Sequence, residues 1–141
     1  MPCEYGIALS LLKLGKKEDA EVILKRIAEE RLDFFSNMYL NTLPYYKAKA
    51  LKYFGKVEEA DALIESKLQG WLNAMDDIDC GAFSTTPFFI NFIDDASFAR
   101  KINFSYLVSV MYHYQGKEEL AKKYAEETAK DGYILRFYPI D

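Results

Sequence analysis

Hydrophobic residues recur every three to four positions over most of this 141-residue chain. Three sets show the spacing most clearly: Ala20, Leu24, Ile27 and Ala28; Val57, Ala60, Ile64, Leu68, Trp71 and Met75; and Ala121, Tyr124, Ala125 and Thr128. This spacing places each set along one side of an α-helix. The pattern predicts an all-α chain of about seven helices, with these stripes in its core.

Three segments of the chain share one turn pattern. In each, a helical run ends at Gly-Lys, at Gly15, Gly55 and Gly116, and an alanine follows five residues after the glycine. A glycine after a helical run can adopt the left-handed backbone conformation that ends a helix. Acidic side chains follow in the first turn of the next helix, where the helix dipole favours them. Each segment therefore predicts a helical hairpin with a tight turn, and the alanine allows its two helices to approach closely.

The spacing of the glycines predicts one helical-repeat domain, residues 1–141, with an irregular last interval. Gly15 and Gly55 are 40 positions apart (55 − 15), whereas Gly55 and Gly116 are 61 apart (116 − 55). The hairpin units are therefore expected at about 1–31, 33–75 and 96–130, with a turn and a short helix inserted over 76–95. Thr86 and Pro87 form a favourable helix start before the apolar run 88–93, for which a strand is the alternative.

Composition narrows the class of protein. Half of the residues are apolar and 28% are charged, as in globular domains. The net charge of −4 and the pI near 5.1 argue against nucleic-acid binding. No apolar run is long enough to span a membrane, and the first residues do not form a signal peptide. Cys3 and Cys80 do not make a disulfide framework, so we expect a cytoplasmic protein with reduced thiols. The helical pattern begins at once, which is typical of a piece of a longer protein.

The three units resemble the tetratricopeptide repeat. The small position of that motif is occupied by Ala8, Ala48 and Ser109, and the large one by Leu11, Leu51 and Tyr112. The opening tryptophan is replaced by Glu4, Pro44 and Ser105, and the closing proline is absent. The resemblance implies an α-α superhelix in which the first helix of each antiparallel pair lines a concave surface.

A second resemblance covers roughly residues 40 to 130. The run from Gly81 to Asp95, followed by Tyr106-Leu107 and the third Gly-Lys unit, is similar to the C-terminal helical region of large bacterial proteins of unknown function. In those proteins a β-rich portion precedes this region, and it resembles carbohydrate-processing domains. The resemblance implies that this chain is the terminal part of such a protein and lacks the catalytic residues of its parent.

Two candidate sites have weak support in the sequence. Cys80 and the single histidine, His113, could form a nucleophile–base pair, but no orienting motif surrounds either of them. Asp76, Asp77 and Asp79 suggest a calcium loop, yet the glycine and glutamate that such a loop requires are missing from their positions. We therefore predict no catalytic residue, no metal site and no cofactor.

A tyrosine lies ten residues before each of the three glycines, at Tyr5, Tyr45 and Tyr106. The tetratricopeptide resemblance places this position on the concave side. The predicted groove consists of Tyr5, Tyr45, Lys49, Lys52, Tyr53, Tyr106, His113 and Tyr114. Tyrosine offers rigid apolar area and a hydroxyl, and lysine offers a positive charge to a carboxylate. The alternative is that the tyrosines only bridge adjacent hairpins and that the lysines form a solvated face.

These observations favour a non-catalytic protein-interaction or scaffolding module. It would dock a peptide or an adjoining domain, which could be the remainder of its own parent chain, on the Tyr/Lys face. The alternative function is an accessory stabilising or sugar-binding domain of a carbohydrate-active protein. The sequence leaves the partner and the oligomeric state open.

Overall fold

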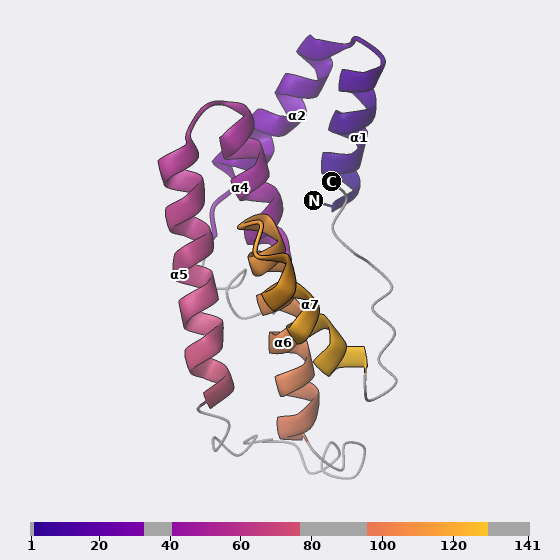
Figure 1. The fold of residues 1–141 in the computed structure, drawn as a ribbon. Coiled ribbons are helices and arrows are strands. Elements are labelled where there is room, and N and C mark those ends of the chain that lie inside the picture. The colour runs from indigo at the N-terminus through magenta and orange to yellow at the C-terminus, as the bar shows by residue number, and fades with distance from the viewer. Residues whose placement is uncertain (1, 33–40, 77–95, 130–141) are drawn as a thin grey trace, which may run out of the picture. The chain divides into compact units, whose positions relative to one another are not determined.

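The computed structural model describes residues 2–32, 41–76 and 96–129 (Figure 1). These residues form six helices and no strand: α1 (Pro2–Lys13), α2 (Lys17–Glu29), α4 (Leu43–Tyr53), α5 (Val57–Asp76), α6 (Ala96–Tyr114) and α7 (Glu118–Ala129). The all-α prediction is confirmed, and the expected number of about seven helices is close. The predicted short helix over 88–93, and the strand that was its alternative, lie outside the described residues.

The described residues fall into two compact units. The first unit comprises the described part of residues 2–67, and the second comprises the described part of residues 68–129. In the first unit α1 packs against α2, and both contact α4. In the second unit α6 packs against α7. Helix α5 contributes its residues 57–67 to the first unit and its remaining residues to the second.

One type of hydrogen-bonded turn closes all three hairpins. Gly15, Gly55 and Gly116 have φ angles of 75°, 78° and 71°. In each turn the glycine N–H donates to the carbonyl three residues earlier, and the next N–H donates to the carbonyl five residues earlier, over 2.9–3.1 Å. This pair of bonds is the Schellman arrangement, which satisfies the last carbonyl groups of a helix. The predicted tight turns are therefore present, and the positive φ explains why a glycine is needed at each of them.

The lysine after each glycine begins the second helix of its hairpin. The carbonyl groups of Lys16, Lys56 and Lys117 accept hydrogen bonds from the N–H groups of Ala20, Ala60 and Ala121, over 3.2, 3.1 and 3.0 Å. These are the first α-helical bonds of the second helices. The fixed interval of five residues between glycine and alanine thus reflects two adjoining hydrogen-bond patterns. A lysine side chain cannot accept a bond from the helix terminus, but two acidic residues in each first turn complement the dipole.

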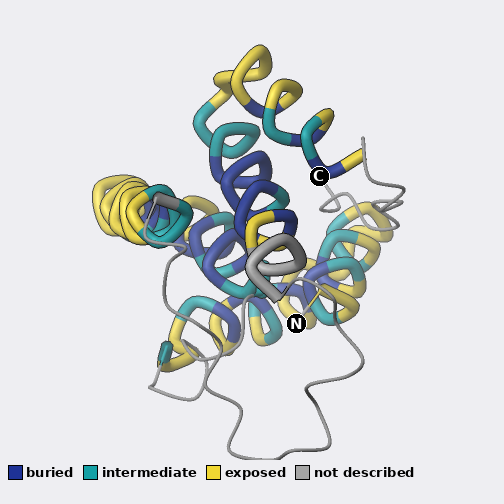
Figure 2. The backbone as a smooth tube through the Cα atoms, turned by 90° about the horizontal axis from the view of Figure 1, so that it is seen from below, coloured by how far each residue is buried: buried dark blue, intermediate teal, exposed yellow. Residues whose placement is uncertain are grey.

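Small residues lie where the helices of each hairpin meet. Ala20 and Ala60 are completely buried, and Ala121 is 7% exposed. The first helices contribute Ala8 and Ala48, which are also completely buried. In Figure 2 the buried positions lie on the described helices between exposed ones, as expected for amphipathic helices. Close helix–helix contact therefore rests on alanine at these positions.

The predicted core stripe of α5 is present only in part, because Trp71 and Met75 are half-buried. Ala60, Ile64 and Leu68 are buried as expected, but Val57 is 43% exposed. Val57 is the first residue of α5 and follows the Gly55 turn directly, so the partner helix ends before it can cover this side chain. The helical period predicts which side of a helix a residue occupies, but it does not predict where the covering helix stops.

Candidate docking surface

The tyrosines at the repeated position of the first unit are core residues. Tyr45 on α4 is completely buried, and Tyr5 on α1 is 6% exposed. Tyr46, which the sequence analysis did not single out, lies between them. Its ring centroid is 5.4 Å from that of Tyr5 and 5.3 Å from that of Tyr45, where the two rings meet edge to face. The three rings join α1 to α4, so Tyr5 and Tyr45 offer almost no area to a ligand. Their placement supports the structural alternative, in which tyrosines bridge adjacent helices.

The four groove residues predicted on α4 follow one side of that helix. Tyr45, Lys49, Lys52 and Tyr53 are spaced by four, three and one residues, which places them in a single stripe, here called the α4 stripe. Its beginning is buried at Tyr45, and its last two residues are exposed. The Lys49 ammonium lies 5.5 Å from the centre of the Tyr45 ring, and Lys52 pairs with Asp61 of α5 over 3.6 Å. The stripe therefore becomes accessible only toward the C-terminal end of α4.

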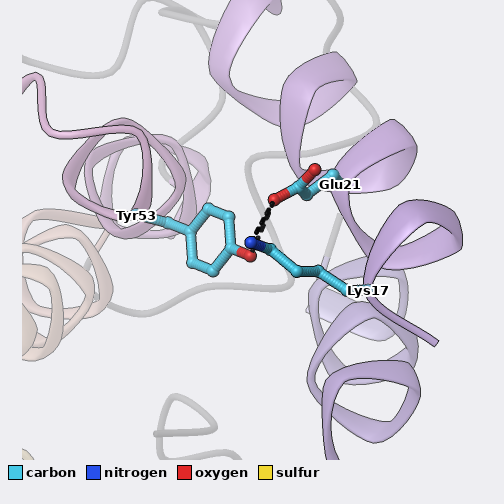
Figure 3. A network of polar contacts seen from close by, with 3 residues as sticks. All are labelled: Lys17, Glu21 and Tyr53. Atoms are coloured by element: carbon cyan, nitrogen blue, oxygen red, sulfur yellow. Dashed lines mark hydrogen bonds and ion pairs between the residues drawn. The ribbon is translucent and has the colours of Figure 1, made fainter. Parts of the chain in front are cut away.

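Tyr53 is the exposed tyrosine of the α4 stripe, and it also contacts the preceding hairpin. Its hydroxyl donates to Glu21 Oε1 on α2 over 3.2 Å, and Lys17 pairs with the same carboxylate over 3.6 Å (Figure 3). Partial burial, together with the neighbouring Glu21 carboxylate, raises the pKa of the Tyr53 hydroxyl above its ordinary value of 10.0. The hydroxyl is therefore in its neutral, donating form at physiological pH.

An exposed apolar cluster surrounds Tyr53 at the α4–α5 turn. The rings of Tyr53 and Phe54 meet edge to face, with centroids 5.2 Å apart. Their exposed fractions are 39% and 40%, and Val57 on the other side of the turn is 43% exposed. We call Tyr53, Phe54 and Val57 the turn cluster. The sequence analysis missed Phe54 and placed Val57 in the core. An aromatic residue directly before the helix-ending glycine was the available signal, because a residue at the tip of a hairpin is covered on few sides.

The second unit holds the other three predicted groove residues, all on α6. Tyr106, His113 and Tyr114 are half-buried and share one side of that helix. His113 Nδ1 is 3.0 Å from Glu118 Oε1 of α7, across the third Gly-Lys turn. The histidine therefore links the two helices of its own hairpin. The eight predicted residues are divided between the units, with five in the first and three in the second.

Aromatic rings also join α6 to α7. Tyr112 and Tyr124 are stacked, with centroids 5.6 Å apart, and the ammonium of Lys117 lies 5.7 Å from the Tyr112 centroid. Tyr112 accepts the backbone hydrogen bond from Lys117 in the Schellman turn, so the same two residues meet through backbone and side chain. We assign these rings to hairpin packing.

The candidates for catalysis and metal binding gain no support. His113 contacts Glu118, whereas Cys80, Asp77 and Asp79 lie outside the described residues. No group of three or more potential metal-ligating side chains gathers anywhere in the part of the chain that the structure describes. Within that part, no helix combines the length and apolarity needed to cross a membrane.

A shallow hollow of about 600 Å³ lies on the outer surface of α2 and the residues just after it. It is lined by Val22, Lys25, Arg26, Glu29, Glu30 and Arg31. Three of its charged side chains already have partners, since Lys25 pairs with Glu29 and Arg26 pairs with Glu4 of α1. The hollow is wide open and has alternating charge, so we assign no ligand to it.

Comparison with protein-family models, with curated proteins and with solved structures finds no match. The resemblance to tetratricopeptide repeats therefore stays a prediction from the residues of the three turns. The relation to β-rich bacterial proteins likewise stays a prediction.

Proposed function

We propose that this chain is a non-catalytic protein-interaction module that docks an extended, carboxylate-bearing segment of a partner protein. The docking surface is the accessible end of the α4 stripe together with the turn cluster. A tetratricopeptide-like origin is part of this proposal and is supported by the three Gly-Lys turns. A cytoplasmic location is also part of it, because Cys3 is an exposed free thiol, and such thiols persist in reducing compartments.

The observation that carries the proposal is the exposed pair formed by Tyr53 and Phe54. Two adjacent rings that are each about two-fifths exposed present rigid apolar area at the surface. Tyrosine is over-represented among the residues that dominate binding energy in protein interfaces. The edge-to-face contact between the rings fixes their orientation before a partner arrives, which lowers the entropic cost of binding.

The charges around this pair favour a carboxylate-bearing partner. Lys49 and Lys52 lie on the same stripe as Tyr53, and Lys56 lies in the adjoining turn. Lys52 and Lys56 pair with exposed carboxylates of α5, at Asp61 and Glu59. Exposed ion pairs of this kind contribute only about 0–1 kcal/mol, so a ligand carboxylate can replace Asp61 or Glu59 at little cost.

The proposal is tested by selection of displayed random 12-residue peptides on the whole chain. Recovered peptides should be rich in Asp and Glu, and they should bind in the micromolar range by isothermal titration calorimetry. The double variant Tyr53→Ala, Phe54→Ser should weaken this binding about tenfold or more, since two aromatic anchors are lost. Lys49→Glu should weaken it further and should reduce its dependence on salt.

The control is Val22→Ser, which removes an exposed apolar side chain from the outer surface of α2. This variant should bind the peptides as the wild type does. Failure to recover any acidic peptide, or equal affinity for wild type and double variant, would overturn the proposal.

A further inference from the structure

Helix α1 has apolar residues on the side that faces away from its own hairpin. Ile7 is 52% exposed and Leu14 is 72% exposed. The residues on this side are Cys3, Gly6, Ile7, Ser10 and Lys13, with Leu14 in the turn that follows, and together they are here called the outer face of α1. The Ser10 hydroxyl donates to the Gly6 carbonyl over 2.9 Å, so its polar atom is directed to the backbone of its own helix. The outer face is therefore apolar and has small residues at its centre, and Lys13 is its charged residue.

The internal repeat shows what covers the same face elsewhere in this chain. When Gly15 is aligned with Gly55, the outer face of α1 corresponds to residues 43, 46, 47, 50, 53 and 54 of α4. On α4 the middle of this face is covered, because Tyr46 is 3% exposed and Ala50 is completely buried, whereas Tyr53 and Phe54 at its end stay partly exposed. Three contacts identify the covering element as the preceding hairpin: Tyr46 meets Tyr5 of α1, Lys47 Nζ donates to the Glu30 carbonyl at the end of α2, and Tyr53 donates to Glu21 within α2.

We propose that the outer face of α1 binds the second helix of another helical hairpin, supplied by a partner protein. The α2–α4 interface of the first unit is the structural template for this contact. The proposal concerns a different surface from the turn cluster and does not depend on the function proposed above.

The template also specifies the chemistry of the partner helix. The position of Tyr53, which bonds to the Glu21 carboxylate, is occupied on α1 by Lys13. A carboxylate near the start of the partner helix would therefore form an ion pair with Lys13. Where α4 has the large Tyr46, α1 has Gly6. A partner helix therefore needs a larger apolar side chain opposite Gly6 than a helix that packs against Tyr46 needs. The partner is an amphipathic helix with an acidic first turn and an aliphatic contact stripe.

The experiment uses a fluorescent helical peptide with the sequence of residues 17–32, which has the acidic first turn and the aliphatic stripe of the template helix. Because isolated helices of this length are marginal in water, a staple joins positions 22 and 26, both exposed in the chain. Fluorescence anisotropy is measured as the full chain is titrated in. The peptide should bind saturably with a micromolar Kd, and a scrambled stapled peptide should not bind.

Two variants of the chain test whether binding occurs at the outer face. Ile7→Asp should raise the Kd about tenfold or more, because it places a carboxylate in the apolar contact. Lys13→Glu, which preserves the apolar surface and the fold, should raise the Kd at low salt and much less at high salt. Circular dichroism confirms that both variants remain helical. Val22→Asp, at an exposed aliphatic position on α2, should leave the Kd unchanged.

Tyr53→Ala should also leave the Kd unchanged, so that this inference and the proposed function succeed or fail separately. An absence of binding up to about 1 mM peptide, or equal affinity in wild type and Ile7→Asp, would overturn the inference. So would Ile7-dependent dimerisation of the chain, measured by light scattering, without peptide binding. That result would make a second copy of this chain the occupant of the face.

Discussion

The hydroxyl of Tyr53 on α4 donates a hydrogen bond to Glu21 on α2, across 3.2 Å and 32 positions of sequence. This contact joins two consecutive hairpins at the surface of the first unit, beside the exposed ring of Phe54. Tyr53 therefore has a structural contact through its hydroxyl and leaves part of its ring accessible. A partner that binds the ring does not need to break the bond between the hairpins.

The ionisation of Tyr53 should report this contact. Its pKa is raised by partial burial and by the Glu21 carboxylate, so the midpoint of its ionisation should lie above pH 10.0. The measurement is absorbance at 295 nm through an alkaline titration, as the difference between wild type and Tyr53→Phe. Glu21→Gln should move the midpoint of this difference curve back toward 10.0, because the nearby negative charge is removed. A midpoint at or below 10.0 in the wild-type difference curve would contradict the contact.

The raised pKa of Tyr53 also determines how its contribution to folding stability changes with pH. Because the pKa of Tyr53 is higher in the folded chain than in the unfolded chain, its contribution is fully present below pH 10.0. The contribution is lost as the pH rises through the folded-state pKa. The difference in urea midpoint between wild type and Tyr53→Phe should therefore be constant from pH 7 to 9 and should shrink above that range.

Overpacking should distinguish the two sides of α5. Ala60 is completely buried, whereas Ala62, two residues later on the same helix, is exposed. Ala60→Leu should lower the free energy of unfolding by about 1–3 kcal/mol, because the helices must separate to admit the larger side chain. Ala62→Leu should change it by less than about 0.5 kcal/mol. Urea denaturation of both variants tests the register of the repeat, and equal midpoints would show that the register is wrong.

Replacing Gly55 or Gly70 by alanine should change the stability of the fold in opposite directions. An added Cβ would meet no atom within 4 Å at either Gly55 or Gly70, so neither change creates a clash. Gly55 has a φ of 78°, and alanine there should cost about 1–2 kcal/mol through backbone strain alone. Gly70 lies inside α5, where alanine should add about 0.5–1 kcal/mol by favouring the helix. Thermal unfolding followed by circular dichroism should show Tm shifts in opposite directions, and a loss of stability in both variants would count against the assigned turn.

The hairpins were predictable because their signals are local. A Gly-Lys pair, two acidic residues in the next first turn and an alanine five positions after the glycine all act within eight residues of sequence. The backbone bonds from Gly15 to Leu12 and from Lys16 to Leu11 form within the same short stretch. The rest of the fold has little influence on local patterns of this kind, so the turns can be predicted from the sequence.

The candidate surface was less predictable, since exposure depends on how far a covering helix extends. Tyr45 and Tyr53 lie on one stripe of α4, yet the first is completely buried and the second is 39% exposed. Tyr46 lies seven residues before Tyr53, on nearly the same side of α4, yet it is 3% exposed, and only the packing of α1 and α2 reveals its role. The repeated position is in the core at Tyr5 and Tyr45 but half-buried at Tyr106, so a position shared by three repeats does not by itself predict exposure.

The last prediction separates the packing tyrosines from the docking surface. Tyr46 is 3% exposed and contacts the rings of both Tyr5 and Tyr45. Tyr46→Ala would leave a large cavity between α1 and α4 and should cost about 3–5 kcal/mol of unfolding free energy. Tyr46→Phe, which keeps the ring, should cost about 0.5–1.5 kcal/mol.

Phe54→Ala is the control for Tyr46→Ala, because Phe54 is an aromatic residue at the C-terminal end of the same helix but is 40% exposed and lies outside the three-ring contact. Its cost should be below about 1 kcal/mol, since little buried contact is lost. Urea denaturation at pH 7 measures all three variants, and peptide titration measures binding for those that remain folded. Phe54→Ala should weaken binding while preserving the fold, and Tyr46→Phe should preserve both. If Tyr46→Ala were as stable as Phe54→Ala, the three tyrosines would not be packing residues, and their assignment to the core would be wrong.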